Sequence, residues 1–181
     1  MLKHRLPFLL VLSLLAIPAL AEEPTPAIPD KVEIRNALTP SPGLLTGGQP
    51  TPEQFDEIAQ AGYRTVINLR GEGEEGRWDE ASRAAELGLE YLELPIAGRG
   101  DINRENALAL AELLAANGRL PAVVHCASGN RVGALFALHA FHAEGADIEA
   151  ALEVGKAAGL TSLVEPVREI LESAASAASE R

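Results

Sequence analysis

Residues 122–135 read AVVHCASGNRVGAL, and this stretch passes from an apolar run through a short polar loop into a second apolar segment. The run 122–126 is typical of a buried strand, and the Ala-, Leu- and Phe-rich segment from Val132 indicates a helix. A strand, a glycine-containing loop and a helix N-terminus form a cradle for anions, because backbone N–H groups point inward and the helix dipole adds partial positive charge. The stretch therefore predicts an anion site at the end of a buried strand.

The loop in this stretch carries side chains suited to chemistry on a bound oxyanion. Cys126 is the only cysteine of the chain, and the cradle favours its thiolate, which is the nucleophilic form. Arg131 offers a planar guanidinium fork that matches a phosphate-like group. The alternative is a buried structural cysteine with an incidental arginine, but a polar run between an apolar strand and an apolar helix has no packing rationale. We interpret Cys126 as a nucleophile aimed at a bound oxyanion or at a sulfur.

The first 21 residues have the pattern of a secretory signal. Lys3 and Arg5 form a basic start, residues 6–17 are apolar but short for a bilayer span, and residues 19–21 (Ala-Leu-Ala) form a small-x-small cleavage site. We expect cleavage after Ala21, a periplasmic or secreted destination and no stable membrane insertion afterwards; an uncleaved anchor is the alternative. The proline-rich residues 22–30 indicate a flexible linker.

Charge and cysteine content narrow the function classes. The formal net charge is −11, and loss of the signal, which holds Lys3 and Arg5 but no acidic residue, makes it −13. Such an acidic protein is a poor partner for nucleic acid or anionic membranes. A single cysteine excludes an internal disulfide, so the fold depends on its core. The four histidines show no metal-ligand spacing, and we expect neither a metal nor a cofactor.

Strand-like and helix-like segments alternate over residues 31–172, which we expect to form one domain. The expected strands are 31–38, 44–46, 65–69, 89–96 and 122–126. The expected helices start at Thr51, Arg77 and Arg104, after the 126–131 loop, after Asp147, and at Thr161 or Ser162. This alternation predicts a single-domain α/β fold with a mostly parallel sheet flanked by helices, in which ligands bind beyond the carboxyl ends of the strands. The Ala- and Ser-rich tail, residues 173–181, is expected to fray.

Four segments, taken in order, resemble the phosphatase-like domain of the beta-lactamase-hydrolase-like proteins, which is similar to the dual-specificity branch of the cysteine phosphatases. They are LLTGGQPTPEQ at 44–54, TVINLR at 65–70 followed by Glu72 or Glu74, LPI at 94–96 and HCASGNRVGA at 125–134. The resemblance covers about residues 31–172. It implies a cysteine-phosphatase fold and a phosphatase activity of the tyrosine or dual-specificity type.

The resemblance also implies roles for residues of the loop. Cys126 would attack the phosphorus of a phosphomonoester, such as a small phosphorylated molecule or a phosphoamino acid, and form a phosphocysteine. Arg131 and backbone N–H groups would bind the phosphoryl oxygens. Asp101, on the loop after the 89–96 strand, would protonate the leaving oxygen, although it could equally be a solvated residue before a helix. The substrate-binding set is His125, Ala127, Ser128, Gly129, Asn130 and Arg131, in which His125 would orient the loop and tune the thiol.

Two features depart from the phosphatase pattern and leave alternatives open. Four residues separate Cys126 from Arg131, whereas those phosphatases have five there and rhodanese sulfurtransferases use the shorter loop. Val132 stands where phosphatases usually have Ser or Thr. A sulfurtransferase or persulfide carrier using Cys126, and a non-catalytic phosphate-binding module, are therefore alternatives. Arg70 either contacts substrate or pairs with the acidic run 72–75, and we favour pairing.

Overall fold

A five-stranded sheet forms the centre of the computed structural model, which describes residues 32–116 and 118–179. The strand order is β1-β2-β5-β3-β4. β2 (Leu44–Gly48), β5 (Ala122–Cys126), β3 (Thr65–Asn68) and β4 (Glu90–Glu93) run parallel, and β1 (Leu38–Ser41) pairs antiparallel with β2 at one edge. The predicted α/β class with a mostly parallel sheet is confirmed.

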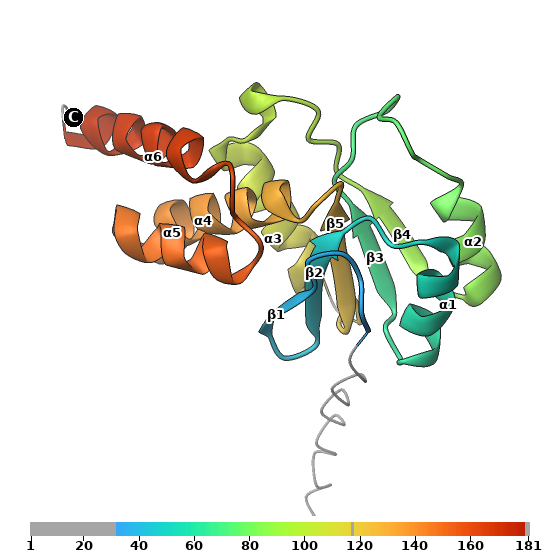
Figure 1. The fold of residues 1–181 in the computed structure, drawn as a ribbon. Helices are drawn as coiled ribbons and strands as arrows, with labels where there is room; N and C mark the ends of the chain where they lie inside the picture. The colour runs from blue at the N-terminus through green and yellow to red at the C-terminus, as the bar shows by residue number, and fades with distance from the viewer. Residues whose placement is uncertain (1–31, 117, 180–181) are drawn as a thin grey trace, which may run out of the picture.

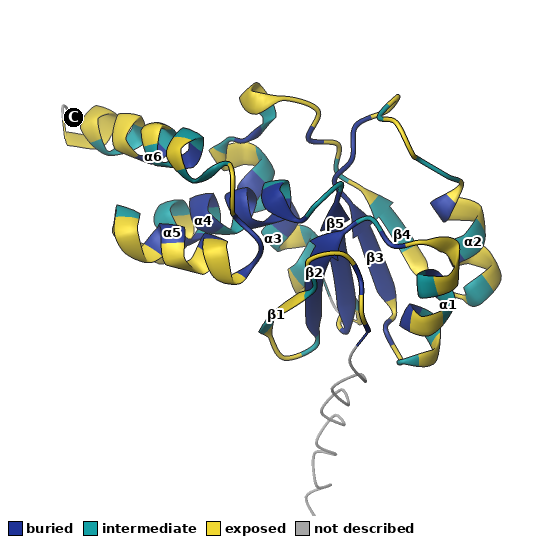
Figure 2. Ribbon diagram, viewed as in Figure 1, coloured by how far each residue is buried: buried dark blue, intermediate teal, exposed yellow. Residues whose placement is uncertain are grey.

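Helices flank the sheet on both sides (Figure 1). α1 (Pro52–Gln60) and α2 (Glu80–Leu87) lie on one side, and a short 3₁₀ turn, η1 (Arg99–Asp101), precedes the helices of the other side. Those helices are α3 (Arg104–Ala115), α4 (Asn130–Glu144), α5 (Ile148–Ala157) and α6 (Val164–Ser179). Covered on both faces, the central strands are buried along their whole length (Figure 2).

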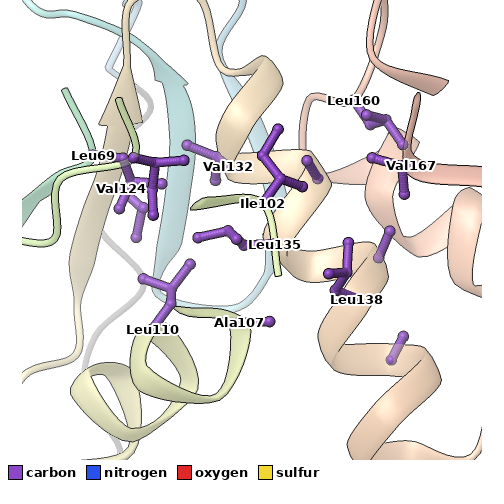
Figure 3. Packing of buried hydrophobic residues seen from close by; sticks show 14 of the residues in the cluster. Leu69, Ile102, Ala107, Leu110, Val124, Val132, Leu135, Leu138, Leu160 and Val167 are labelled. Atoms are coloured by element: carbon purple, nitrogen blue, oxygen red, sulfur yellow. The ribbon is translucent and has the colours of Figure 1, made fainter. Parts of the chain in front are cut away.

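Alternate residues of β5 point into two separate hydrophobic clusters. Val123 packs with Phe55 and Ile58 of α1. Val124 belongs to the larger cluster with α3, α4 and α6 (Figure 3), and Cys126 is a member of the same cluster. This alternation follows from the two-residue period of a strand. His125 therefore lies on the α1–α2 side of the sheet and Cys126 on the α4 side, although they are neighbours in the chain.

Side-chain caps set the starts of three helices where the sequence predicts them. Thr51 and Gln54 form a reciprocal capping box at α1, Asn103 caps α3 through the Asn106 amide, and Asp147 caps α5. These caps satisfy backbone N–H groups that have no partner within the helix. α2 starts at Glu80, after an Asp79 cap, and not at Arg77 as predicted.

One predicted strand boundary at the start of the domain is wrong. The edge strand is not 31–38, because Asn36 adopts a left-handed conformation (φ 53°) and turns the chain before β1 begins at Leu38. Pro40 is tolerated there because an edge strand has one unpaired side. The tail predicted to fray from Ser173 continues as helix to Ser179, consistent with the high helix propensity of alanine. The predicted signal peptide (1–21) and linker (22–30) lie outside the described residues.

Over residues 32–116 and 118–179, no helix has the length and apolar character needed to cross a bilayer.

Candidate active site

The loop from Cys126 to Arg131 joins the carboxyl end of β5 to the first turn of α4. The Cys126 side chain is buried, and the Gly129 N–H donates a hydrogen bond to its Sγ over 3.1 Å. Gly129 has φ 89°, a conformation that favours glycine, and it caps α4. An N–H donor aimed at sulfur stabilises negative charge on it. The loop is therefore folded around Cys126 as a strand-loop-helix cradle, as predicted.

Arg131 reaches across the site to a glutamate on another loop. Its two terminal nitrogens contact the two carboxylate oxygens of Glu74, at 2.5 and 2.8 Å, and one also donates to the Ile96 carbonyl over 2.7 Å. The hydrogen bond from Arg131 is the main cause that lowers the pKa of Glu74 to about 2, and the same bond raises the pKa of Arg131. Both groups are therefore charged, and Glu74 holds the guanidinium fork that an oxyanion would need.

Arg70 pairs with the acidic loop, as we favoured from the sequence. Its side chain is buried, and its Nε contacts Glu74 at 3.1 Å. It also donates to the Glu75 carbonyl over 2.5 Å and to the Gln49 side-chain oxygen. Glu74 is thus held between two arginines, and Arg70 acts on the site by fixing this carboxylate.

A pocket of about 430 Å³ opens beside the loop. Ser128, Asn130 and Arg131 contribute to it from the loop side, and Glu74 lies at its border. Its apolar wall comes from the segment after β4 and from the start of α6, and includes Ala97, Ile102, Leu163 and Pro166. The pocket therefore offers cationic and apolar surface next to the cradle.

Two asparagines, one outside the loop and one within it, tie the loop to neighbouring segments. Asn36 donates to the Ser128 carbonyl over 3.0 Å. The Asn130 side chain accepts from the Thr161 N–H over 2.9 Å and donates to Ser162 Oγ over 2.5 Å. The Asn130 side chain, which was predicted to bind substrate, therefore holds the segment that connects α5 to α6. Ser162 serves this contact, and α6 begins later, at Val164.

Asp101, the predicted acid, lies in η1, and its carboxylate is engaged by its own loop. One oxygen accepts hydrogen bonds from the Ala97 and Gly98 N–H groups, over 2.9 and 3.0 Å. This loop contributes Ala97, Gly98 and Arg99 to the lining of the pocket, but Asp101 is not among the lining residues. The structure thus places Asp101 on the loop beside the pocket, with its side chain stabilising that loop.

His125 lies behind the cradle in a buried polar network. Its Nε2 is 2.9 Å from an oxygen of Glu80, without the alignment of a hydrogen bond, and its Nδ1 is 3.4 Å from the Cys126 carbonyl oxygen. Glu80 also accepts from the Gln49 side chain over 2.7 Å and from the Tyr91 hydroxyl over 3.2 Å. Sequence reasoning missed Glu80, because an acidic residue in a first helical turn is ordinarily a solvated one.

Over residues 32–116 and 118–179, no cluster of three or more His, Cys, Asp or Glu side chains is arranged to hold a metal ion.

Comparison with known proteins agrees with this architecture. A beta-lactamase hydrolase-like protein from Xylella fastidiosa is 34% identical over 99 residues, which are 52% of this chain and 22% of that protein. The chain thus spans about a fifth of that relative's length. A candidate phosphatase from Neisseria meningitidis is 26% identical with a TM-score of 0.63, over 76% of this chain and 96% of that one. TpbA from P. aeruginosa, solved with phosphotyrosine, is 20% identical with a TM-score of 0.56, over 85% and 89% of the two chains.

The profile of one protein family matches residues 31–164, which is most of the chain. That family is described as DSP-PTPase phosphatase fused to NAD+ kinase. The matched range includes every strand of the sheet and the whole Cys126–Arg131 loop. The chain therefore belongs to this DSP-PTPase phosphatase family.

Proposed function

We propose that this protein is a cysteine-dependent phosphatase that acts on a phosphomonoester through a covalent phosphocysteine at Cys126. The Sγ thiolate attacks phosphorus as the bond to the leaving oxygen breaks, and that oxygen takes up a proton. Water then hydrolyses the phosphorus–sulfur bond and releases inorganic phosphate and the thiolate. The carrying observation is the cradle itself, in which the Gly129 N–H lies 3.1 Å from Sγ at the start of α4.

Arg131 supplies the charge that the transition state needs. Its fork is bound to Glu74 in the structure, so the phosphoryl group has to replace that carboxylate on the guanidinium. A phosphate dianion carries more charge than a carboxylate and presents three oxygens, which supports the exchange. The phosphoryl oxygens would then lie between Arg131 and the N–H groups of residues 127–131, where developing charge is stabilised.

Glu74 and Asp101 are the two carboxylates from which the leaving oxygen could receive its proton. Asp101 was the residue expected from the sequence, and its loop borders the pocket, but its carboxylate accepts two backbone N–H bonds. It can serve only if the 97–101 loop rearranges around substrate. Glu74 lines the pocket, yet its pKa of about 2 keeps it ionised while Arg131 holds it.

The substrate class that fits is a small phosphorylated molecule or a phosphoamino acid. A pocket of about 430 Å³ with an apolar wall that includes Leu163 and Pro166 has room for a compact leaving group. TpbA, which shares the fold, was solved with phosphotyrosine. The acidic character of the chain opposes polyanionic partners.

Sulfur transfer is a second candidate, favoured by the four-residue spacing between Cys126 and Arg131. A persulfide on Cys126 needs no general acid, which suits a site where Asp101 is engaged elsewhere. The same cradle would then hold an anionic sulfur donor such as thiosulfate.

Turnover with two donors separates the candidates. Wild type and Cys126→Ser are incubated with p-nitrophenyl phosphate, and in parallel with thiosulfate and cyanide. The phosphatase predicts phosphate release by the wild type that is lost in Cys126→Ser, with no thiocyanate formed. Thiocyanate without phosphate release would establish sulfur transfer instead. If neither product forms, the non-catalytic phosphate-binding module is the remaining candidate.

Export is a further part of this proposal, supported by the basic, apolar and small-x-small pattern of residues 1–21. Expression of the full chain in a bacterial host with two membranes should give a periplasmic form that begins at residue 22. N-terminal sequencing of that fraction is the measurement. A chain that retains residue 1 and sediments with membranes would contradict cleavage.

A further inference from the structure

Glu80 is a carboxylate buried in the protein interior, with an exposed fraction of 2%. It is the first residue of α2, where the helix dipole stabilises negative charge. Three side chains from three different segments converge on it: Gln49 at 2.7 Å, Tyr91 at 3.2 Å and His125 at 2.9 Å. Burial of a carboxylate is costly unless its oxygens are satisfied. This convergence fixes Glu80 behind the nucleophile loop.

The ring of His125 is fully buried between two oxygen atoms. Its Nε2 faces Glu80 at 2.9 Å and its Nδ1 faces the Cys126 carbonyl at 3.4 Å. The contact between Nε2 and Glu80 is close but is not aligned as a hydrogen bond, and we place a proton on Nε2 because a lone pair there would face the lone pairs of a carboxylate. Nδ1 also faces an acceptor, and only a proton there makes the contact favourable. Both nitrogens are donors in the imidazolium form alone.

Further groups surround the pair formed by His125 and Glu80. Burial and the charge of Glu80 raise the pKa of Tyr91, so its phenol keeps the proton that it donates to Glu80. Arg70 faces this network through Gln49. The strand neighbours of His125, Gly47 on β2 and Asn68 on β3, are neutral. The other ionisable side chains of residues 125–131 are those of Cys126 and Arg131.

We propose that Glu80 is a positioning residue for the Cys126 nucleophile: it holds His125 as an imidazolium, whose positive charge, on the residue next to Cys126, favours the thiolate. This inference rests on the proposed function, in which Cys126 attacks as the thiolate. A carboxylate on α2 would thereby control a thiol on the opposite side of the sheet. Glu80 contacts neither Cys126 nor the pocket, so its effect passes through the ring.

The test is the pH dependence of Cys126 alkylation by iodoacetamide, which needs no substrate. Glu80→Gln keeps the shape of the side chain, and its amide can donate to Nε2, so His125 becomes neutral. We expect the pH of half-maximal alkylation rate to rise by about one unit, with about tenfold slower alkylation below it. Glu86→Gln is the control, because Glu86 lies on the same helix but is exposed and pairs with Arg83 at the surface. It should leave the profile unchanged.

A folded Glu80→Gln with the wild-type alkylation profile would overturn the proposal. If that variant does not fold, nitrogen NMR of the chain with Glu80 retained gives the same answer. His139→Asn and His142→Asn are introduced into that chain to simplify the spectrum. The proposal predicts protons on both ring nitrogens of His125 at neutral pH, and a neutral ring would overturn it. Failure of the proposed function would be seen separately. In that case the protein releases no phosphate, although its alkylation profiles match the expectation.

Discussion

Two oxyanions compete for one guanidinium at Arg131. The side chain binds Glu74 through both of its terminal nitrogens, and in the proposed reaction it must bind a phosphoryl group in the same way. A lysine at this position would carry the charge but not the planar fork. The geometry of the pair, and not only its charge, therefore decides how the site works.

Arg131→Lys should lower kcat/KM for p-nitrophenyl phosphate by about a hundredfold or more, because removal of one transition-state donor has effects of this size. Phosphate binding measured by calorimetry should weaken as well. Arg168→Lys is a matched control, because Arg168 pairs with Glu149 at an exposed site on α6. An Arg131→Lys variant with wild-type phosphate affinity would contradict the placement of Arg131 in the site.

Glu74→Gln should destabilise the protein in a pH-dependent manner. The pKa of Glu74 falls from 4.5 to about 2 on folding, so its contribution is complete above pH 4.5 and is lost as the pH falls through about 2. At neutral pH we expect the free energy of unfolding of the variant to lie about 1 kcal/mol below that of the wild type, a value discounted for partial exposure. By about pH 3 this difference should have more than halved. Urea unfolding at both pH values measures it. Glu72→Gln, exposed in the same loop, should show little change, and a deficit independent of pH would contradict the pairing.

Sequence reasoning identified the site residues whose chemistry is unusual for their surroundings. Cys126 and Arg131 interrupt an apolar strand-helix sequence, so no packing role competes with a chemical one. Glu80 was missed because its burial depends on Gln49, Tyr91 and His125, which are distant in the chain. Local sequence likewise could not reveal that Asp101 binds the Ala97 and Gly98 N–H groups.

At the scale of elements, the position of the cradle depends on how closely α4 approaches the segment after α5. A Cβ on Gly133 would lie 2.0 Å from the Leu160 amide nitrogen and 2.5 Å from the Gly155 carbonyl oxygen. These are backbone atoms, so the two helices would have to separate. That movement would also pull on Asn130, which holds the Thr161 N–H.

Gly133→Ala should therefore lower the free energy of unfolding by about 3 kcal/mol, at the upper end of the range for overpacking. Urea denaturation is the measurement. Gly100→Ala is the control, because a Cβ there meets no atom within 4 Å, and it should be nearly neutral. Equal stability of the two variants would show that α4 and α5 can move apart at little cost.

Elements with strong local signals were predictable, and those set by distant contacts were not. The capping box at Thr51 and Gln54 and the cap at Asn103 act within one helical turn, so sequence spacing alone locates them. β1 depends on pairing with β2 and on a turn at Asn36, which propensity does not specify. The same holds for the start of α6, because Ser162, where a helix start was expected, is used for a contact with Asn130.

The charge of the whole molecule acts against the reaction proposed for its site. With a formal net charge of −11, the protein repels a phosphate dianion at long range, and salt screens this repulsion. We expect kcat/KM for p-nitrophenyl phosphate to rise about two- to threefold between about 10 and 200 mM salt. Steady-state rates over this range measure the effect. A fall in rate with salt would show that the local field of Arg131 and its neighbours outweighs the global charge.

In the proposed mechanism, Cys126 becomes covalently phosphorylated during turnover. Intact-protein mass spectrometry after rapid acid quenching, with p-nitrophenyl phosphate as substrate and Cys126→Ser alongside, detects this intermediate. Val132, in place of the usual Ser or Thr, is expected to slow hydrolysis of the intermediate, which helps it to accumulate. We expect a phosphoryl adduct on Cys126 that is absent from Cys126→Ser. Phosphate release by wild type and Cys126→Ser alike, or a sulfur adduct with no phosphoryl adduct, would contradict it.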